Sequence, residues 1–255
     1  MTAVLDAVDI TVRFGGVTAV DQVGLRVEPG EVVGLIGPNG SGKTTFLNAL
    51  TGIVPASGSV AVAGARLSLG SPRRARRAGV LRVFQAPQTF DELSCLENVL
   101  VSQPDRALTG LAAACLLRPL VMRRERARWV AAEEVLLRVG LDGVAATPAG
   151  ALSYGRRRLL ELARALYARP RLLLLDEPSA GLNDAETAEL AAVIDGLGDG
   201  DLATVLVDHK VHVIDALCSR VVVLEMGRLI AEGGPADIWR DPRVVDAYLG
   251  VVESA

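Results

Sequence analysis

The sequence lacks several features that would assign it to particular protein classes. It has no uninterrupted apolar stretch of about 18 residues, the length that suggests a membrane-spanning helix. Its N-terminus lacks the basic-then-apolar pattern of a signal peptide. The formal net charge of −3 gives no general case for nucleic-acid binding. We therefore expect a chain that stays in the cytoplasm and does not bind nucleic acid.

Cysteine and aromatic residues are also scarce. Cys95, Cys115 and Cys218 are an odd number, widely spaced, and show no metal-ligand pattern, so they are interpreted as buried or incidental thiols. The 255 residues are 50% hydrophobic and 22% charged, which is typical of a globular chain with a large core and not of a disordered one.

Lysine is almost absent, and its position is informative. Of the 27 basic residues only Lys43 and Lys210 are lysines. Lys43 lies in a G-x-x-x-x-G-K-[ST] motif that follows an apolar strand candidate, residues 32–36, and precedes a helix candidate that continues to Leu50. This context predicts a phosphate-binding loop made of Gly37, Pro38, Asn39, Gly40, Ser41, Gly42, Lys43, Thr44 and Thr45.

The residue types in this loop suit phosphate chemistry. Phosphate oxygens need several converging backbone N–H groups, which glycines and the positive end of a helix supply. Lys43 adds a cation for the β- and γ-phosphates, and the Thr44 hydroxyl is a possible Mg²⁺ ligand.

Residues 4–28 alternate apolar and polar side chains, which predicts antiparallel strands with one solvated face. Residues 58–64 predict a further strand of the same layer. Phe14, beside Gly15-Gly16, has two interpretations: it stacks on a nucleotide base, or it belongs to the core. The cluster Arg73, Arg74, Arg76 and Arg77 is interpreted as a solvated helix face.

Polar residues follow three further apolar runs. Residues 80–84 end at Gln85, the four leucines 172–175 precede Asp176 and Glu177, and residues 204–207, interpreted as the last buried strand, precede Asp208 and His209. Parallel strands would gather these side chains at one sheet edge. A buried acidic pair needs a cation, and Mg²⁺ supplies one. His212 is expected on the following helix, in a solvated or structural role.

A helical stretch separates these runs. Apolar residues at three- and four-residue spacing predict helix from Asp91 to about Arg138, within an insertion that we place at residues 86–168. Ser153 is expected to be the N-cap of the next helix, whose first-turn N–H groups could bind an anion.

Taken together, the chain resembles the nucleotide-binding subunits of ATP-binding cassette (ABC) transporters over almost its whole length. Residues 37–45 match the Walker A loop, Gln85 the Q-loop, residues 152–155 the signature motif, Asp176-Glu177 the Walker B pair, residues 179–182 the D-loop and His209 the switch histidine. The resemblance implies one α/β domain, 1–255. Its P-loop NTPase (RecA-like) core and antiparallel β subdomain comprise 1–85 and 169–255, and its helical subdomain comprises 86–168.

The resemblance also implies roles. Two subunits close head to tail on two ATP molecules, so that Ser153 and Gly155 of one meet the ATP held by Lys43 of the other. Glu177 and His209 would be catalytic, while Phe14 would stack on adenine. Thr44, Gln85 and Asp176 would hold Mg²⁺.

Softer patterns, such as residues 13–21, 96–100 and 247–250, are similar to the ATPases of branched-chain amino acid importers. Membrane permease subunits, a second ABC ATPase subunit in a homo- or heterodimer, and an extracytoplasmic solute-binding protein are then expected partners. The chain would lie peripherally on the cytoplasmic face of the membrane. Urea or amide import, and a soluble cassette acting on ribosomes or DNA, remain alternatives.

Two positions depart from the family pattern. Arg156 stands where the signature usually has glutamine, and Lys210 stands where this subgroup usually has an acid. Arg156 adds positive charge at a tight subunit interface, which bears on the strength of closure.

Overall fold

A computed structural model describes residues 2–103, 118–198 and 200–249. The chain divides into two compact units, which we describe separately. The core unit comprises residues 1–85, 170–180 and 187–255, and the helical unit comprises residues 86–169 and 181–186. The helical subdomain predicted at residues 86–168 stays a prediction.

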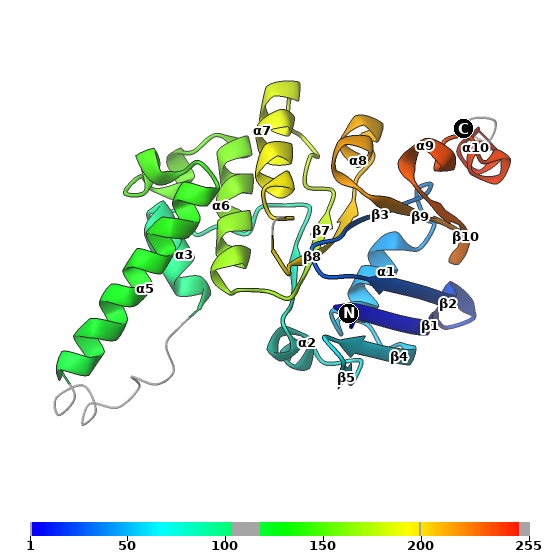
Figure 1. The fold of residues 1–255 in the computed structure, drawn as a ribbon, viewed down its shortest axis with the longest axis horizontal. Helices are drawn as coiled ribbons and strands as arrows, with labels where there is room; N and C mark the ends of the chain where they lie inside the picture. The colour runs from blue at the N-terminus through cyan, green and yellow to red at the C-terminus, as the bar shows by residue number, and fades with distance from the viewer. Residues whose placement is uncertain (1, 104–117, 199, 250–255) are drawn as a thin grey trace. The chain divides into compact units, whose positions relative to one another are not determined.

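The core unit contains a six-stranded sheet of order β10-β9-β3-β8-β7-β6, in which only β10 runs antiparallel to its neighbour (Figure 1). Every residue of β3, β7 and β8 is buried, as expected for strands covered on both faces. The strands are β3 (Val32–Ile36), β6 (Val80–Val83), β7 (Leu172–Asp176), β8 (Ala203–Val207), β9 (Arg220–Glu225) and β10 (Arg228–Gly233).

The expectation that residues 204–207 form the last buried strand is wrong. The sheet continues with β9, which pairs in parallel with β3 and buries Val221 to Leu224. This strand leads into a tight turn at Met226 and Gly227, both with positive φ, instead of into polar site residues. The other parallel strands are marked in the sequence by the site residues after them, and β9 carries no such marker.

A second sheet, of order β2-β1-β4-β5, is entirely antiparallel. Its strands are β1 (Leu5–Phe14), β2 (Val17–Val27), β4 (Ser57–Val62) and β5 (Ala65–Leu67). The alternation predicted for residues 4–28 is confirmed, because the buried side chains of β1 and β2 are the apolar ones.

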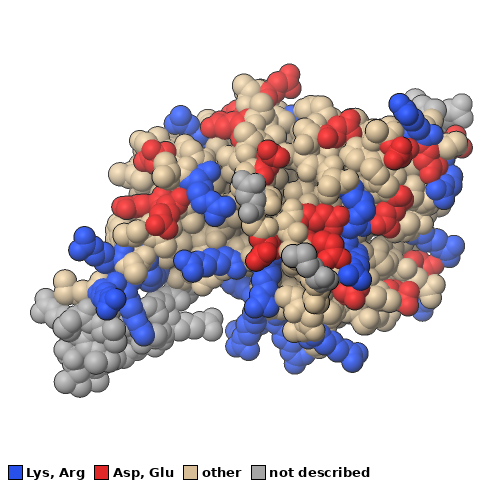
Figure 2. All heavy atoms as spheres, viewed as in Figure 1, with Lys and Arg blue, Asp and Glu red and all other residues tan. Residues whose placement is uncertain are grey.

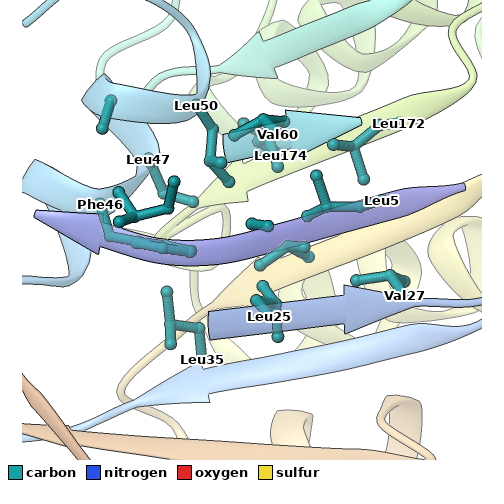
Figure 3. Packing of buried hydrophobic residues seen from close by; sticks show 14 of the residues in the cluster. Leu5, Leu25, Val27, Leu35, Phe46, Leu47, Leu50, Val60, Leu172 and Leu174 are labelled. Atoms are coloured by element: carbon teal, nitrogen blue, oxygen red, sulfur yellow. The ribbon is translucent and has the colours of Figure 1, made fainter. Parts of the chain in front are cut away.

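The helix that follows the phosphate loop, α1 (Lys43–Leu50), packs into the main core of this unit. Figure 3 shows Phe46, Leu47 and Leu50 of α1 among side chains of both sheets, such as Leu5 and Leu174. Phe46 and Leu47 have no exposed surface. The helix start that carries Lys43 is thus anchored by apolar packing from its own next turn.

The helical unit contains α3 (Cys95–Ser102), α5 (Arg118–Arg138), α6 (Tyr154–Tyr167) and two short 3-10 turns, Asp142–Val144 and Ala149–Ala151. The helix predicted from Asp91 begins only at Cys95, because Ser94 and Glu97 form a capping box there. The buried Asn98 amide donates to the carbonyls of Phe90, Leu93 and Ser94 and so orders the preceding loop. Part of the predicted helical stretch, 104–117, lies outside the described residues, as does Cys115.

The remaining helices are α2 (Pro72–Ala78), α7 (Asp184–Asp195), α8 (Val211–Leu217), α9 (Pro235–Ile238) and α10 (Pro242–Leu249). The four arginines of α2 are exposed, and Figure 2 shows basic side chains gathered along the lower edge of that view. The solvated-face interpretation of this cluster is therefore confirmed. Among the described helices, none combines the length and apolar character needed to cross a membrane.

Both described cysteines, Cys95 and Cys218, are buried. Burial, reinforced by the nearby negative charges of Asp208 and Asp215, raises the pKa of Cys218 to about 12. This thiol therefore stays protonated at neutral pH and packs as a small apolar group, as the sequence suggested.

One polar network joins the two sheets of the core unit. Arg220 of β9 donates from Nε to Glu31 Oε1 (2.8 Å) and from Nη2 to Glu31 Oε2 (3.0 Å), and it also contacts Glu232 of β10. Its Nη2 donates to the carbonyl of Arg26 on β2 (2.5 Å). These hydrogen bonds, above all those to Glu31, raise the pKa of Arg220. The guanidinium therefore holds an edge of the antiparallel sheet against the parallel one.

We predict that Arg220→Gln lowers the free energy of unfolding by about 2 kcal/mol, since it removes several charge-assisted hydrogen bonds and leaves Glu31 without its bidentate partner. Urea denaturation followed by circular dichroism measures this as a lower midpoint. The matched control is Arg243→Gln, because Arg243 pairs with Asp241 at the surface, with 67% of its side chain exposed. An equal shift in both variants would contradict the structural role of Arg220.

Candidate functional site

The phosphate loop leaves the central strand β3 and enters α1 at Lys43. No side chain caps the start of α1, since its N-cap residue is Gly42. By contrast, α3 and α6 begin with serines whose hydroxyls accept from the first turn. Within the part of the chain that the structure describes, the N-cap of α1 thus supplies no side-chain acceptor to its first N–H groups, which is the arrangement that an incoming phosphate needs.

Two loop glycines are required by close packing. A Cβ on Gly37 would lie 2.0 Å from the Leu224 carbonyl oxygen, and one on Gly42 would lie 2.6 Å from the Ala19 carbonyl oxygen. Both residues also have positive φ. Gly40, also with positive φ, has nothing within 4 Å of the Cβ position, so that part of the loop is open.

Lys43 is folded into the loop. Its Nζ donates to the carbonyls of Gly37 (2.7 Å) and Pro38 (2.9 Å) and to Ser41 Oγ (3.4 Å). Only 6% of the residue is exposed. This burial lowers the pKa of Lys43, while Glu177 and Asp176 act in the opposite direction. The ammonium is held by acceptors that it can exchange for phosphate oxygens.

Glu177 lies at the carboxyl edge of the sheet between two of the predicted site residues. Its Oε2 accepts from Gln85 Nε2 (2.8 Å), and its Oε1 lies 2.9 Å from His209 Nε2. The backbone of Glu177 has φ 50°, a conformation that costs roughly 1 kcal/mol for a residue with a side chain. Its N–H donates to the Val207 carbonyl (2.8 Å), which holds it there. The sheet thus brings Gln85, Glu177 and His209 together.

Asp176 is paired with a residue that the sequence reasoning missed. Arg82 of β6 donates to Asp176 Oδ2 and to Asn48 Oδ1 (2.6 Å), and its guanidinium lies 4.8 Å from the centre of the Phe84 ring. Asp176 and Arg82 have 7% and 4% of their side chains exposed. A charged residue within the apolar run 80–84 was the available signal, since it needs a buried partner.

Phe84 also departs from expectation. It lies beyond the end of β6 and is 40% exposed, so it does not close the buried run.

The other acid at this edge, Asp208, is structural. It accepts from the backbone N–H (3.2 Å) and the hydroxyl (2.7 Å) of Ser179. Lys210 donates from Nζ to the Thr187 hydroxyl (2.8 Å), and His212 lies on α8 as expected. These contacts fix the segments on both sides of His209.

Phe14 ends β1 and is 49% exposed. The interpretation of this ring as a core residue is therefore excluded. Its stacking on a nucleotide base stays a prediction. Gly15, which follows, has positive φ and turns the chain into β2.

In the helical unit, the predicted N-cap is confirmed: Ser153 Oγ accepts from the Arg156 N–H (3.3 Å) at the start of α6. A Cβ on Gly155 would lie 2.7 Å from Glu186 Oε1, so a larger residue at this position would displace the end of the Glu186 side chain. Arg156 is exposed. The start of α6 therefore presents the Arg156 charge to solvent.

A divalent cation at the acidic edge would need oxygen ligands that are not already engaged. No group of three or more His, Cys, Asp or Glu side chains able to hold a metal occurs in residues 2–103, 118–198 and 200–249. However, Asp176 Oδ1 is buried and has no hydrogen-bond partner in that same part of the chain. An orphaned carboxylate oxygen beside a phosphate loop fits Mg²⁺, which is commonly shared between one or two protein ligands and phosphate oxygens.

The arrangement therefore combines a loop for an anionic phosphate chain with a carboxylate that is oriented by an amide and an imidazole. Such a set can bind a nucleoside triphosphate and activate water next to it.

Comparison with known proteins agrees with this geometry. A family model described as "ABC transporter" matches residues 20–180, and one described as "Branched-chain amino acid ATP-binding cassette transporter" matches residues 228–254. The high-affinity branched-chain amino acid transport ATP-binding protein BraF of Pseudomonas aeruginosa is 39% identical over 97% of this chain and 98% of its own length. LivG of Escherichia coli K12, which carries the same description, is 39% identical over 94% and 95%.

A solved structure shows the same architecture. The ADP conformation of an ATP-binding cassette of an ABC transporter superposes with a TM-score of 0.84, at 28% identity, over 98% of this chain and 100% of its own. The predicted P-loop fold with an antiparallel β subdomain is thereby confirmed. The chain belongs to the ABC transporter family, as an ATP-hydrolysing subunit similar to those of the branched-chain amino acid group.

Proposed function

We propose that this chain hydrolyses ATP with Glu177 as the general base and so energises the uptake of branched-chain amino acids. The observation that carries the proposal is the position of the Glu177 carboxylate, which is bonded to both Gln85 and His209 at the sheet edge beside the phosphate loop. A base must be held in one orientation to act on a single water, and these two contacts supply that restraint.

The residues around the phosphates have separate roles. The N–H groups of residues 37–45 and the Lys43 ammonium bind the β- and γ-phosphates. Glu177 takes a proton from the water that attacks the γ-phosphorus, the bond to the bridging oxygen breaks, and ADP leaves. His209 holds the γ-phosphate and the water in line. Phe14 stacks on adenine.

Mg²⁺ would be held by the Thr44 hydroxyl, Gln85 and Asp176. When bound it neutralises part of the phosphate charge. The orphaned Oδ1 of Asp176 supports this assignment, while its other oxygen is engaged by Arg82.

The signature residues act on a second nucleotide. Ser153 and Gly155 of one subunit would contact the ATP bound by the partner subunit, in a homodimer or heterodimer. The exposed start of α6 in the helical unit supports this role.

The solute and the partners are inferred from relatives. BraF and LivG are named as branched-chain amino acid transport proteins, and the C-terminal family model carries the same description. We therefore assign this chain to an importer with membrane permease subunits and an extracytoplasmic solute-binding protein. It would sit peripherally on the cytoplasmic face of the membrane.

Glu177→Gln is expected to lower ATP turnover at least about 100-fold, because the amide cannot accept the proton. ATP binding should persist, so the variant should accumulate as an ATP-bound dimer on size-exclusion chromatography. Phosphate release measures the first effect, and Glu28→Gln, on an exposed side chain, serves as the matched control. Full turnover in Glu177→Gln would overturn the catalytic assignment.

Lys43→Ala should weaken ATP binding at least about tenfold, because a charge-assisted contact to phosphate is lost. Calorimetry or a fluorescent ATP analogue measures the affinity. Arg66→Ala removes a basic residue that is exposed on β5 in the antiparallel sheet, and it should leave the affinity unchanged. Unchanged affinity in Lys43→Ala would contradict the phosphate-loop assignment.

The transport role is tested by isolating the tagged chain from gently solubilised membranes of its host. We expect permeases, a sister ATPase and a solute-binding protein that is thermally stabilised by leucine, isoleucine or valine. Stabilisation by urea or amides alone would overturn the solute. Recovery of ribosomes or DNA-repair proteins without a permease would overturn transport.

A further inference from the structure

The C-terminal helix contacts the phosphate loop directly. The backbone N–H of Gly37 donates to the hydroxyl oxygen of Tyr248 on α10, at 2.9 Å, across 211 positions of sequence. Both residues lie in the core unit. Gly37 is buried, and a buried N–H without an acceptor is costly. The hydroxyl therefore satisfies a donor that belongs to the first residue of the loop.

Gly37 is held on its other side by Lys43. Its carbonyl oxygen accepts from Lys43 Nζ (2.7 Å), which also donates to the Pro38 carbonyl. The third Nζ donor is engaged by Ser41 Oγ (3.4 Å), so binding oxygens of both the β- and the γ-phosphate requires Nζ to release at least one of these carbonyls as well as Ser41. Once Lys43 turns away, the Tyr248 bond still restrains Gly37, and the absent Cβ lets Gly37 remain against Leu224.

Tyr248 is positioned by aromatic packing and a further hydrogen bond. Its ring meets Trp239 edge to face, with centroids 6.2 Å apart, and Val244 and Ala247 anchor α10 in the core. Trp239 Nε1 donates to Asp215 Oδ1 (2.7 Å) on α8, the helix that follows His209. Figure 1 shows α9 and α10 next to β10, and the contacts of α9 with α8 and β10 agree.

Burial raises the pKa of Tyr248, while the smaller effect of the Gly37 hydrogen bond is in the opposite direction. The phenol therefore stays neutral across the physiological range. Its oxygen remains a constant acceptor for Gly37 and does not act as a pH switch.

We propose that Tyr248 is a positioning residue for ATP binding: its hydroxyl holds Gly37 when Lys43 moves from the loop carbonyls to the phosphates. Trp239 and Asp215 extend this contact to α8. The inference rests on the proposed binding of phosphates by residues 37–45. It assigns a role in ATP binding to residues 235–249, which lie within the segment matched by the C-terminal family model.

The first test is Tyr248→Phe, which keeps the ring on Trp239 and removes only the acceptor. ATP affinity, measured by calorimetry on the full chain, is expected to fall about tenfold, while kcat at saturating ATP changes less than about twofold. The matched control is Tyr167→Phe, because the Tyr167 hydroxyl bonds the Arg128 carbonyl (3.4 Å) within the helical unit. That variant should bind ATP as the unaltered chain does.

Wild-type affinity in Tyr248→Phe, or an equal loss in Tyr167→Phe, would overturn the inference. If Lys43→Ala weakens ATP binding and Tyr248→Phe does not, only the role of Tyr248 fails. If Lys43→Ala has no effect either, the proposed phosphate loop itself fails.

A second readout is independent of turnover. The chain has two tryptophans, so Trp129→Phe leaves Trp239 as the single indole reporter next to Tyr248. Adding ATP with EDTA, which prevents hydrolysis, should change Trp239 emission in this background. The change should disappear when Tyr248→Phe is added at ATP concentrations that saturate both proteins. A change that persists unaltered would show that Tyr248 does not carry the signal and would overturn the proposal.

Discussion

Charge placed at the buried carboxyl edge of a sheet has to be compensated, and the site is built around this constraint. Asp176 is paired with Arg82, Glu177 is bonded to Gln85 and His209, and Asp208 accepts from Ser179. Each carboxylate therefore has a fixed partner before any ligand arrives, because a desolvated charge without one would cost several kcal/mol. The partners also set the geometry, which leaves one oxygen of Asp176 without a hydrogen bond among the described residues.

Much of this edge could be predicted from the sequence. The fully buried strands β3, β7 and β8 are mostly apolar runs, and parallel pairing places the residues at their carboxyl ends side by side. The spacing of glycine and lysine identified the loop. The same glycines are required by packing, because the carbonyl oxygens of Leu224 and Ala19 leave no space for a Cβ at Gly37 and Gly42. At these two positions the residue that the sequence motif specifies is also the residue that the packing of the loop requires.

The parts that escaped prediction depend on contacts between distant residues. By its pattern Arg82 is a polar residue in a short strand, and only the pairing of β6 with β7 places it against Asp176. Similarly, β9 is not followed by site residues that would mark it as one of the parallel strands. Tyr248 belongs to a helix 211 residues from its partner. Periodicity describes which face of an element is buried, but it carries no information on which buried side chains meet.

These contacts bear on how tightly the loop can hold ATP. In the structure Lys43 already has three acceptors, Gly37, Pro38 and Ser41, so under the proposed function ATP binding exchanges hydrogen bonds of Lys43 instead of creating them. The net gain from the lysine is then the difference between phosphate and carbonyl acceptors, and it grows with phosphate charge. An exchange of this kind favours release once the γ-phosphate has gone, because the carbonyls remain in place to take the ammonium back. The proposed role of Tyr248 belongs to this step, because its hydroxyl accepts from the Gly37 N–H and so helps to keep the Gly37 carbonyl in place while Lys43 is bound to phosphate.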